Sequence, residues 1–188
     1  LWADVDIAGP GHKHQPCPAD CAKPHKHKLP LPPDEDTARR IIAESGLPEP
    51  TIWIHSGGGL YPIWLLKPAH HISDLDDIKS LAAGWQKVIG HAAEKLGWDY
   101  GTGVGDLARV LRIPGTINRK EGLARPCRIV DASPRRYTLK ELQVALADAL
   151  ATLPQPEPTV GVGDSLGDGT PPGRDYNNRP DWAHILHP

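Results

Sequence analysis

The 188-residue chain has no methionine, only three cysteines and no long hydrophobic run. No apolar stretch approaches the roughly 20 residues that a transmembrane helix needs, and no basic-then-apolar leader is present, so we expect a cytoplasmic protein without membrane contact. Cys127 lies far from Cys17 and Cys21 in the sequence, which argues against a disulfide framework and for a reducing compartment. The lack of methionine even at position 1 leads us to expect a fragment without its natural N-terminal part.

The chain also lacks a large excess of either positive or negative charge, because 21 basic and 23 acidic residues leave a formal net charge of −2. A strongly basic chain would indicate a nucleic-acid partner through its overall field. Here any such contact has to come from a local patch. Composition therefore neither supports nor excludes a polynucleotide partner, and the length suits one domain with some surplus.

Two carboxylates stand out in the apolar run that opens the chain. In a β-strand Asp4 and Asp6 would share one face, while Ala3, Val5 and Ile7 would share the other. Two adjacent carboxylates repel each other unless a cation lies between them. The simpler interpretation is an edge strand with one wet face. The alternative is a pair of ligands for Mg²⁺ or Mn²⁺, which prefer carboxylate oxygens.

Helix signals occur in three places, with strand signals between them. Acidic residues begin a predicted helix over 34–46, which ends at Gly46. Ser73 is a candidate N-cap for a second helix, in which apolar residues recur at helical spacing over 75–96. Thr138 and Glu141 have the spacing of a capping box and begin a third helix over 138–150. Residues 51–55 and 60–66 predict two strands around a glycine turn, where Pro62 indicates a bulge or an edge.

Two further segments complete the predicted order. Residues 107–113 form another apolar segment that ends at Pro114-Gly115, and 127–131 predict a short strand. The order predicts an α+β fold with a mixed, largely antiparallel sheet and flanking helices. From 153 to 174 the composition indicates a Pro/Gly-rich linker, and 175–188 resemble the start of a following module.

An insertion over residues 8–33 is rich in His, Cys and Lys. The Cys-x3-Cys pair is within the spacing of finger-type zinc ligands, although His-x-His is shorter than usual. The four candidate ligands of a structural zinc ion are Cys17, Cys21, His25 and His27. The alternative is a flexible basic loop in which His12, His14 and several lysines contact a nucleic-acid backbone.

Three segments carry a resemblance to a known family: Asp4-Val5-Asp6, the hairpin from His55 to Trp64, and Gly105-Asp106 with the run Arg109-Val-Leu-Arg-Ile-Pro-Gly-Thr-Ile-Asn-Arg-Lys120. Their order and content resemble the catalytic core of the archaeo-eukaryotic primase superfamily, in particular the bifunctional primase-polymerase domains of phages and plasmids. The resemblance covers residues 1–152. It implies a primase-polymerase core with an RRM-like element, truncated at its N-terminus.

The resemblance implies that Asp4, Asp6 and Asp106 are catalytic and hold two Mg²⁺ or Mn²⁺ ions. Two such ions about 4 Å apart can stabilise both the attacking and the leaving oxygen of a nucleotidyl transfer. The residues expected to bind the nucleotide provide backbone amides, hydrogen bonds and positive charge: His55, Ser56, Gly57, Gly58, Gly59, Tyr61, Arg109, Arg112 and Lys120. Partners would be a single-stranded DNA template, nucleoside triphosphates and, by analogy with phage replication proteins, a helicase module.

The chain departs from the family in its second motif, where many relatives carry a histidine two residues past the glycines. Here Leu60-Tyr61 follows the glycines and the nearest histidine is His55, before Ser56. Tyrosine can donate a hydrogen bond to phosphate but brings no positive charge. Either Tyr61 substitutes for the histidine or His55 reaches the site from its strand, which requires a bulged hairpin.

Each element of the motif set also has an ordinary interpretation. Arg109 and Arg112 could be solvated charges on a helix face, the glycines a flexible turn, and Asp106 a turn residue. Two other functions therefore stay open beside primer synthesis or DNA polymerisation. One is a metal-dependent nuclease or phosphodiesterase, and the other is a non-catalytic, zinc-containing nucleic-acid-binding module.

Overall fold

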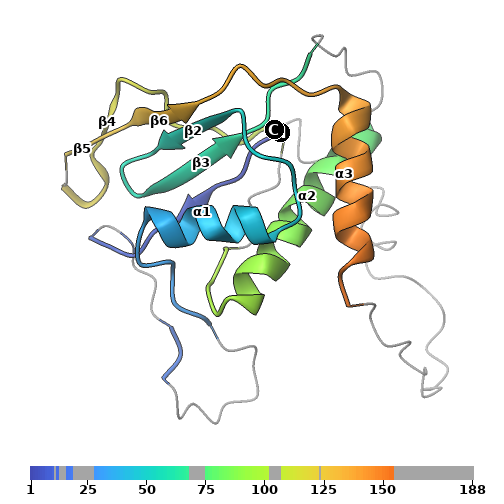
Figure 1. The fold of residues 1–188 in the computed structure, drawn as a ribbon. Coiled ribbons are helices and arrows are strands. Elements are labelled where there is room, and N and C mark those ends of the chain that lie inside the picture. Colours follow the sequence, from blue (N-terminus) through green and yellow to red (C-terminus); the bar gives the residue numbers. More distant parts are fainter. Residues whose placement is uncertain are drawn as a thin grey trace, which may run out of the picture. The chain divides into compact units, whose positions relative to one another are not determined.

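A four-stranded antiparallel sheet forms the centre of the protein, which was analysed as a computed structural model (Figure 1). The structure describes residues 1–10, 12, 16–18, 28–67, 75–101, 107–122 and 124–154. Within them the strands are β1 (Val5–Asp6), β2 (Ile52–His55), β3 (Gly59–Ile63) and β6 (Arg128–Ala132), in the order β1-β3-β2-β6. A separate pair joins β4 (Ile117–Asn118) to β5 (Arg125–Pro126). The described unit, Leu1–Leu153, is thus α+β, as predicted.

All three predicted helices are present, with the expected ends where the structure describes them. Helix α1 (Glu35–Glu44) begins at Asp34, whose carboxylate accepts a hydrogen bond from Thr37 N at 2.8 Å, and Gly46 follows its end with φ 74°. Helix α2 spans Leu75–Lys95. Helix α3 (Leu139–Ala151) has the predicted capping box between Thr138 and Glu141.

Pro62 lies on an inner strand, so the expected edge position is wrong. Strand β3 pairs with β2 in continuous register and with β1 on its other side. Pro62 O accepts from Ala3 N at 3.0 Å, but proline has no N–H to donate in return. The ladder to the first strand is therefore interrupted: Trp2 forms an isolated bridge with Ile63, and regular pairing resumes only at β1. The register shift in this sheet lies between β2 and β6.

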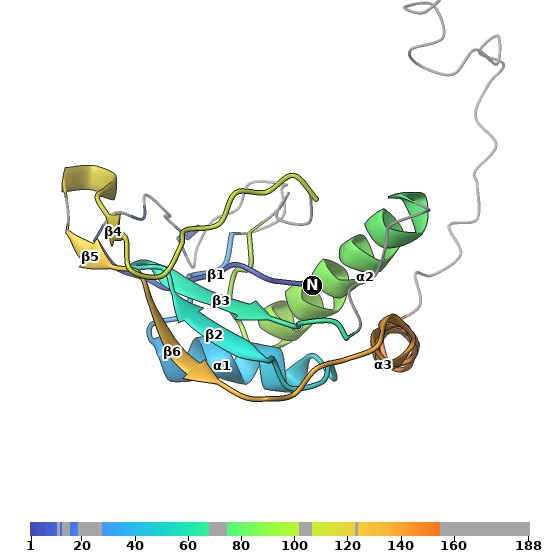
Figure 2. The same ribbon diagram turned by 90° about the horizontal axis from the view of Figure 1, so that it is seen from above.

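The main core lies between one face of the sheet and the helices. Ala3 and Val5 are fully buried, and Trp64 packs edge-to-face on Trp85 of α2 with ring centroids 5.1 Å apart. Figure 2 shows α1 along one face of the sheet, while the segment 107–116 passes across the other face. Alternate side chains of the first strand segment therefore point to opposite faces of the sheet, with Ala3 and Val5 in the core.

The apolar segment 107–113 adopts neither helix nor strand and does not join the main core, although Leu111 packs against a second, smaller cluster formed by Ile54, Tyr61 and Cys127. Its other large apolar side chains are exposed: Leu107 by 41%, Val110 by 90% and Ile113 by 71%. Arg109 and Arg112, which lie between these apolar residues in the sequence, line a cavity. The apolar residues of this segment therefore do not mark a core element. The segment ends at the predicted turn, where Gly115 has φ 93°.

Several predicted features lie outside the described residues: Asp106, Ser73, His14, Cys21, His25, His27, the linker from 155 onward and the module 175–188. Among the helices that the structure describes, none is both long and apolar enough to cross a membrane.

Candidate functional site

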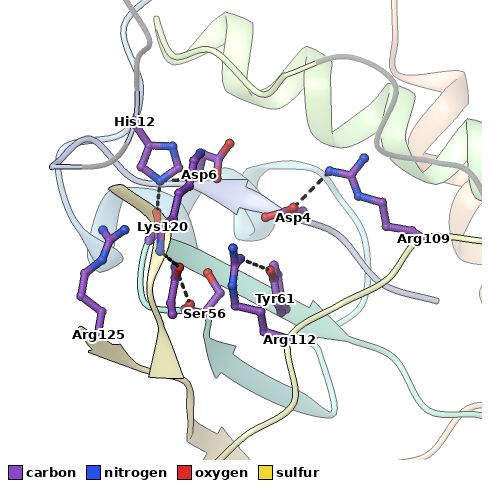
Figure 3. Close-up of a pocket in the computed structure, with 11 residues that line it drawn as sticks. Asp4, Asp6, His12, Ser56, Tyr61, Arg109, Arg112, Lys120 and Arg125 are labelled. Atoms are coloured by element: carbon purple, nitrogen blue, oxygen red, sulfur yellow. Dashed lines mark hydrogen bonds and ion pairs between the residues drawn. The ribbon is translucent and has the colours of Figure 1, made fainter. Parts of the chain in front are cut away.

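A polar cavity of about 220 Å³ lies on the sheet face opposite the core (Figure 3). The groups that line it come from the first strand segment, residue 12, the turn after β2, strand β3, the segment 107–113 and the β4–β5 connection. They are Asp4, Asp6, His12, Ser56, Gly58, Tyr61, Arg109, Arg112, Asn118, Lys120 and Arg125. Segments more than 100 residues apart in the sequence therefore converge on one volume.

Asp4 and Asp6 share the cavity face, as strand alternation predicts. The side chain of Asp4 is 15% exposed and that of Asp6 is 52% exposed. Burial, followed by the neighbouring Asp6 carboxylate, raises the pKa of Asp4 to about 6. Arg109 opposes this rise, with its Nη2 3.5 Å from Asp4 Oδ2. Arg109, together with the more weakly acting Arg112, therefore opposes the pKa rise of Asp4 only in part.

Arg112 and Tyr61 form a second polar pair in the cavity. Arg112 Nη1 donates to Tyr61 OH at 3.2 Å, and burial raises the pKa of the tyrosine. The neutral phenol leaves the guanidinium charge uncancelled. Both Arg109 and Arg112 come from a non-helical segment, so the interpretation of these arginines as charges on a helix face is wrong.

His55 does not line the cavity, contrary to its predicted role in nucleotide binding. Its Nδ1 accepts from Gly57 N at 3.0 Å, and its Nε2 lies 3.6 Å from Glu35 Oε1 at the start of α1. Burial lowers the pKa of His55, and Glu35 opposes that shift. The hairpin register between β2 and β3 has no bulge that would turn His55 inward. Of the two alternatives, His55 and Tyr61, it is Tyr61 that lines the cavity.

The three glycines differ in their surroundings. Gly57 has φ 82°, and an added Cβ would lie 2.9 Å from Arg125 Cβ. A Cβ on Gly59 would overlap the carbonyl oxygen of Val5 in the adjacent strand. These two positions pack against protein and do not line the cavity, so they are not the phosphate-facing amides that we predicted. Only Gly58 lines it, together with Ser56.

Three cavity residues were not among the predicted site residues. His12 belongs to the insertion, yet its Nε2 lies 2.8 Å from Gly58 O and 3.7 Å from Asp6 Oδ1. Asn118 is buried, and its Nδ2 donates to Ser56 O at 3.2 Å. Arg125 lies on β5, and its Nε and Nη2 are buried without a hydrogen-bond partner in the described part of the chain. The Ile-Asn-Arg-Lys run could have drawn attention to Asn118, whereas no local signal marks Arg125.

The predicted zinc site is described only at Cys17, whose Sγ accepts from Lys28 N at 3.4 Å. Within the ranges that the structure describes, no three His, Cys, Asp or Glu side chains form a metal-binding group. Two of the three predicted catalytic carboxylates, Asp4 and Asp6, do lie together in the cavity. Comparison of the chain with protein-family models, curated proteins and solved structures finds no match in any of the three.

Proposed function

We propose that the cavity is the active site of a template-dependent nucleotidyl transferase of the primase-polymerase type. The observation that carries this proposal is the meeting of two adjacent carboxylates and four cationic side chains in one polar cavity. Phosphoryl chemistry needs both, because divalent cations require hard oxygen ligands while the phosphates require positive charge.

The carboxylate pair fits a divalent cation. Asp4 is largely buried, and its pKa is raised first by that burial and then by the neighbouring Asp6 carboxylate, so a bound cation would favour the ionised form of both groups. Asp4 and Asp6 would hold Mg²⁺ or Mn²⁺, with Asp106 as the further ligand that the family resemblance implies. When bound, such ions lower the pKa of the attacking hydroxyl and stabilise the leaving oxygen.

The cationic wall would bind and orient the triphosphate. Arg109 already balances Asp4 at 3.5 Å, and its release toward a phosphate would follow once a cation neutralises that carboxylate. The positive charge of Arg112 is not neutralised by its hydrogen-bond partner, because the Tyr61 phenol is uncharged. Lys120 can act as a point charge, whereas each arginine can contact two phosphate oxygens. Ser56 and Gly58 line the same cavity as these cationic groups.

Asn118 connects two of the segments that line the cavity. Its side chain joins Ser56 O to the backbone N of Lys120, with distances of 3.2 and 3.1 Å. The hairpin with the glycine turn and the Arg-rich run are therefore connected beneath the cavity. In the proposed reaction this connection holds Ser56 and Lys120 in a fixed position relative to each other.

We further propose the rest of the assignment that the family resemblance implies. The fold is the primase-polymerase core with its RRM-like element, and the partners are a single-stranded DNA template, nucleoside triphosphates and a helicase module. The order of the motifs along the chain supports this view: an acidic strand, a glycine hairpin and an Arg-rich run. Residues from all three of these segments line the cavity.

A primer-synthesis assay tests the proposal. The 188-residue protein is incubated with single-stranded DNA, Mg²⁺ or Mn²⁺, and labelled ribonucleotides or deoxyribonucleotides. We expect labelled product longer than a dinucleotide with the wild type and none with Asp6→Asn. Asp131→Asn is the matched control, because Asp131 lies on β6 and pairs with Arg39 away from the cavity.

A second reaction with end-labelled template, together with metal and nucleotide binding measurements, separates the other two functions. Shortening of labelled template without incorporation would establish a nuclease in place of a polymerase. Unchanged metal and nucleotide binding in the double variant Asp4→Ala with Asp6→Ala would exclude an enzyme that acts through these carboxylates and favour a non-catalytic binding module.

A further inference from the structure

The glycine turn after β2, residues 56–59, is held by hydrogen bonds to its carbonyl groups. Ser56 O accepts from Asn118 Nδ2 at 3.2 Å, and Gly58 O accepts from Ile7 N at 3.0 Å. Within the turn, Gly59 O accepts from Ser56 N at 2.8 Å. The turn contributes Ser56 and Gly58 to the cavity, so its conformation decides where these two residues lie.

The amide of Gly57 is bound by the side chain of His55, which lies outside the cavity. Gly57 N donates to His55 Nδ1 at 3.0 Å. A backbone amide can only donate, so Nδ1 must be unprotonated, and the proton of the neutral imidazole then lies on Nε2. His55 Nε2 lies 3.6 Å from Glu35 Oε1, where the negative charge of the carboxylate favours a proton. Both contacts therefore select the same neutral tautomer.

His55 and Asn118 hold opposite ends of one peptide group. The carbonyl of Ser56 and the amide of Gly57 belong to the same planar unit, in which the C=O and the N–H point in opposite directions. Asn118 binds the carbonyl end, and His55 binds the amide end. Rotation of this peptide group would break both hydrogen bonds, so the two side chains together fix its orientation.

Gly57 is the point of the turn that most needs such a restraint. Its φ is 82°, and an added Cβ would lie 2.9 Å from Arg125 Cβ and 3.0 Å from Asn118 Cβ. The position therefore requires glycine, which has more backbone freedom to lose on folding than any other residue. A hydrogen bond to its amide from outside the turn restricts that freedom.

Charged groups on three elements face the imidazole of His55: Glu35 from α1, Arg128 from β6 and Arg125 from β5. Burial lowers the pKa of His55, Glu35 opposes that shift, and the two arginines add to it. The neutral imidazole can therefore accept from Gly57 at neutral pH. A protonated Nδ1 would instead place its own N–H against that of Gly57.

We propose that His55 is a positioning residue of the candidate active site: its Nδ1 clamps the Ser56–Gly57 peptide group from the side of α1, opposite Asn118, and so sets the place of Ser56 and Gly58 in the cavity. The effect of this clamp on nucleotide binding rests on the proposed function. The clamp itself is a property of the protein alone and can be measured without metal or nucleotide.

Nuclear magnetic resonance of the isotope-labelled 188-residue protein tests the clamp in the wild type. At neutral pH the imidazole spectrum should show His55 with Nδ1 unprotonated and Nε2 protonated. On acidification the Gly57 amide resonance should shift with the same midpoint as the His55 imidazole, because protonation removes the acceptor. A proton on Nδ1 at neutral pH, or a Gly57 resonance that does not follow His55, overturns the clamp. This measurement needs no variant, so it decides even if a substitution prevents folding.

Two substitutions of similar polarity separate the clamp from simple packing. In His55→Asn the side-chain oxygen can take the place of Nδ1, whereas in His55→Gln the polar end lies nearer the place of Nε2. Hydrogen exchange of the Gly57 amide should be about tenfold faster in His55→Gln than in wild type, and within about threefold of wild type in His55→Asn. His91→Gln on α2 is the matched control, because His91 does not line the cavity, and it should leave the exchange unchanged. Equal exchange in the Asn and Gln variants would contradict the clamp.

Nucleotide incorporation then links the clamp to the proposed function. The KM for the nucleotide should rise about fivefold in His55→Gln with little change in kcat, and His55→Asn should restore it, because the clamp positions the turn and takes no part in the chemistry. Incorporation with the same KM in both variants would leave the enzyme assignment standing and remove the positioning role. A Gly57 amide that depends on His55 as described, without any incorporation by wild type, would establish the clamp and contradict the nucleotidyl transferase.

Discussion

The two faces of the sheet are organised on opposite principles, although the same short strand contributes to both. On the core face Ala3 and Val5 are fully buried among apolar neighbours. On the cavity face Asp4 is partly buried beside a second carboxylate, and two nitrogens of the partly buried Arg125 are shielded without a hydrogen-bond partner in the described part of the chain. The first face stabilises the fold, whereas the second carries unbalanced charge that a ligand can balance. Substitutions on the two faces should therefore have opposite consequences.

The largest effect is expected from a carboxylate of the cavity face. Asp6→Asn should reduce nucleotide incorporation about 1000-fold, since loss of a metal ligand removes several kcal/mol of transition-state stabilisation. Its thermal stability should stay within a few degrees of wild type, because the Asp6 side chain is 52% exposed. Steady-state incorporation and a melting curve on the same preparation measure both. A variant with full activity would place the chemistry elsewhere.

The core face should show the reverse pattern. Leu60 on β3 is fully buried opposite Val5, and Leu60→Ala should lower the free energy of unfolding by about 2–5 kcal/mol. Val144→Ala on α3 is the control, because Val144 is 52% exposed and its truncation should cost under about 0.5 kcal/mol. Denaturant titrations at one pH compare the two. Equal losses would show that the sheet face is not the main core.

The raised pKa of Asp4 predicts how stability depends on pH in the metal-free protein. A folded-state pKa of about 6 against a usual value of 3.8 means that the folded state holds this proton more tightly than the unfolded state. The resulting stabilisation is complete below about pH 4 and is lost as the pH rises through 6. Above that pH ionised Asp4 lowers the free energy of unfolding by about 3 kcal/mol.

Asp4→Asn removes this titration and isolates its contribution. The variant should be more stable than wild type at pH 7 and equally stable near pH 4, in denaturant titrations with a chelator present. Added Mn²⁺ should stabilise wild type but not the variant. Parallel stability curves for the two proteins across this pH range would show that Asp4 carries no unbalanced charge.

The smallest change is expected at Gly58, where the backbone rather than a charge is altered. Gly58→Ala would place a methyl group 2.8 Å from His12 Nε2, so the end of that side chain has to shift. Stability should fall by no more than about 1 kcal/mol. The KM for the nucleotide should nevertheless rise, because the methyl group occupies space in the cavity. A drop in kcat with constant KM would argue against a role in nucleotide binding.

Local signals predicted most of the fold and part of the site. Capping at Asp34 and Thr138, the apolar stripe of α2 and the alternation at Asp4 and Asp6 all depend on neighbours within a few residues, and all are confirmed. Pro62 misled because an inner strand can lose one N–H when its partner strand is interrupted at the same place. Propensity alone does not reveal which strand will lie beside it.

The site residues that sequence reasoning misplaced depend on long-range contacts. His55 was expected in the cavity, but the start of α1 holds it on the other side through Glu35. His12 and Arg125 reach the cavity from an insertion and from a two-stranded extension. Neither contact leaves a trace in local sequence, because each requires segments at least 46 residues apart to meet at Gly58.

Simultaneous binding of metal and triphosphate is the central claim, and electron paramagnetic resonance of Mn²⁺ tests it most directly. Titration of Mn²⁺ into the protein with a saturating nucleoside triphosphate should show two bound ions per chain in wild type. In Asp6→Asn that binding should be lost, while Asp131→Asn should keep it. Identical Mn²⁺ binding in wild type and Asp6→Asn would contradict the assignment of this cavity as a nucleotidyl-transfer site.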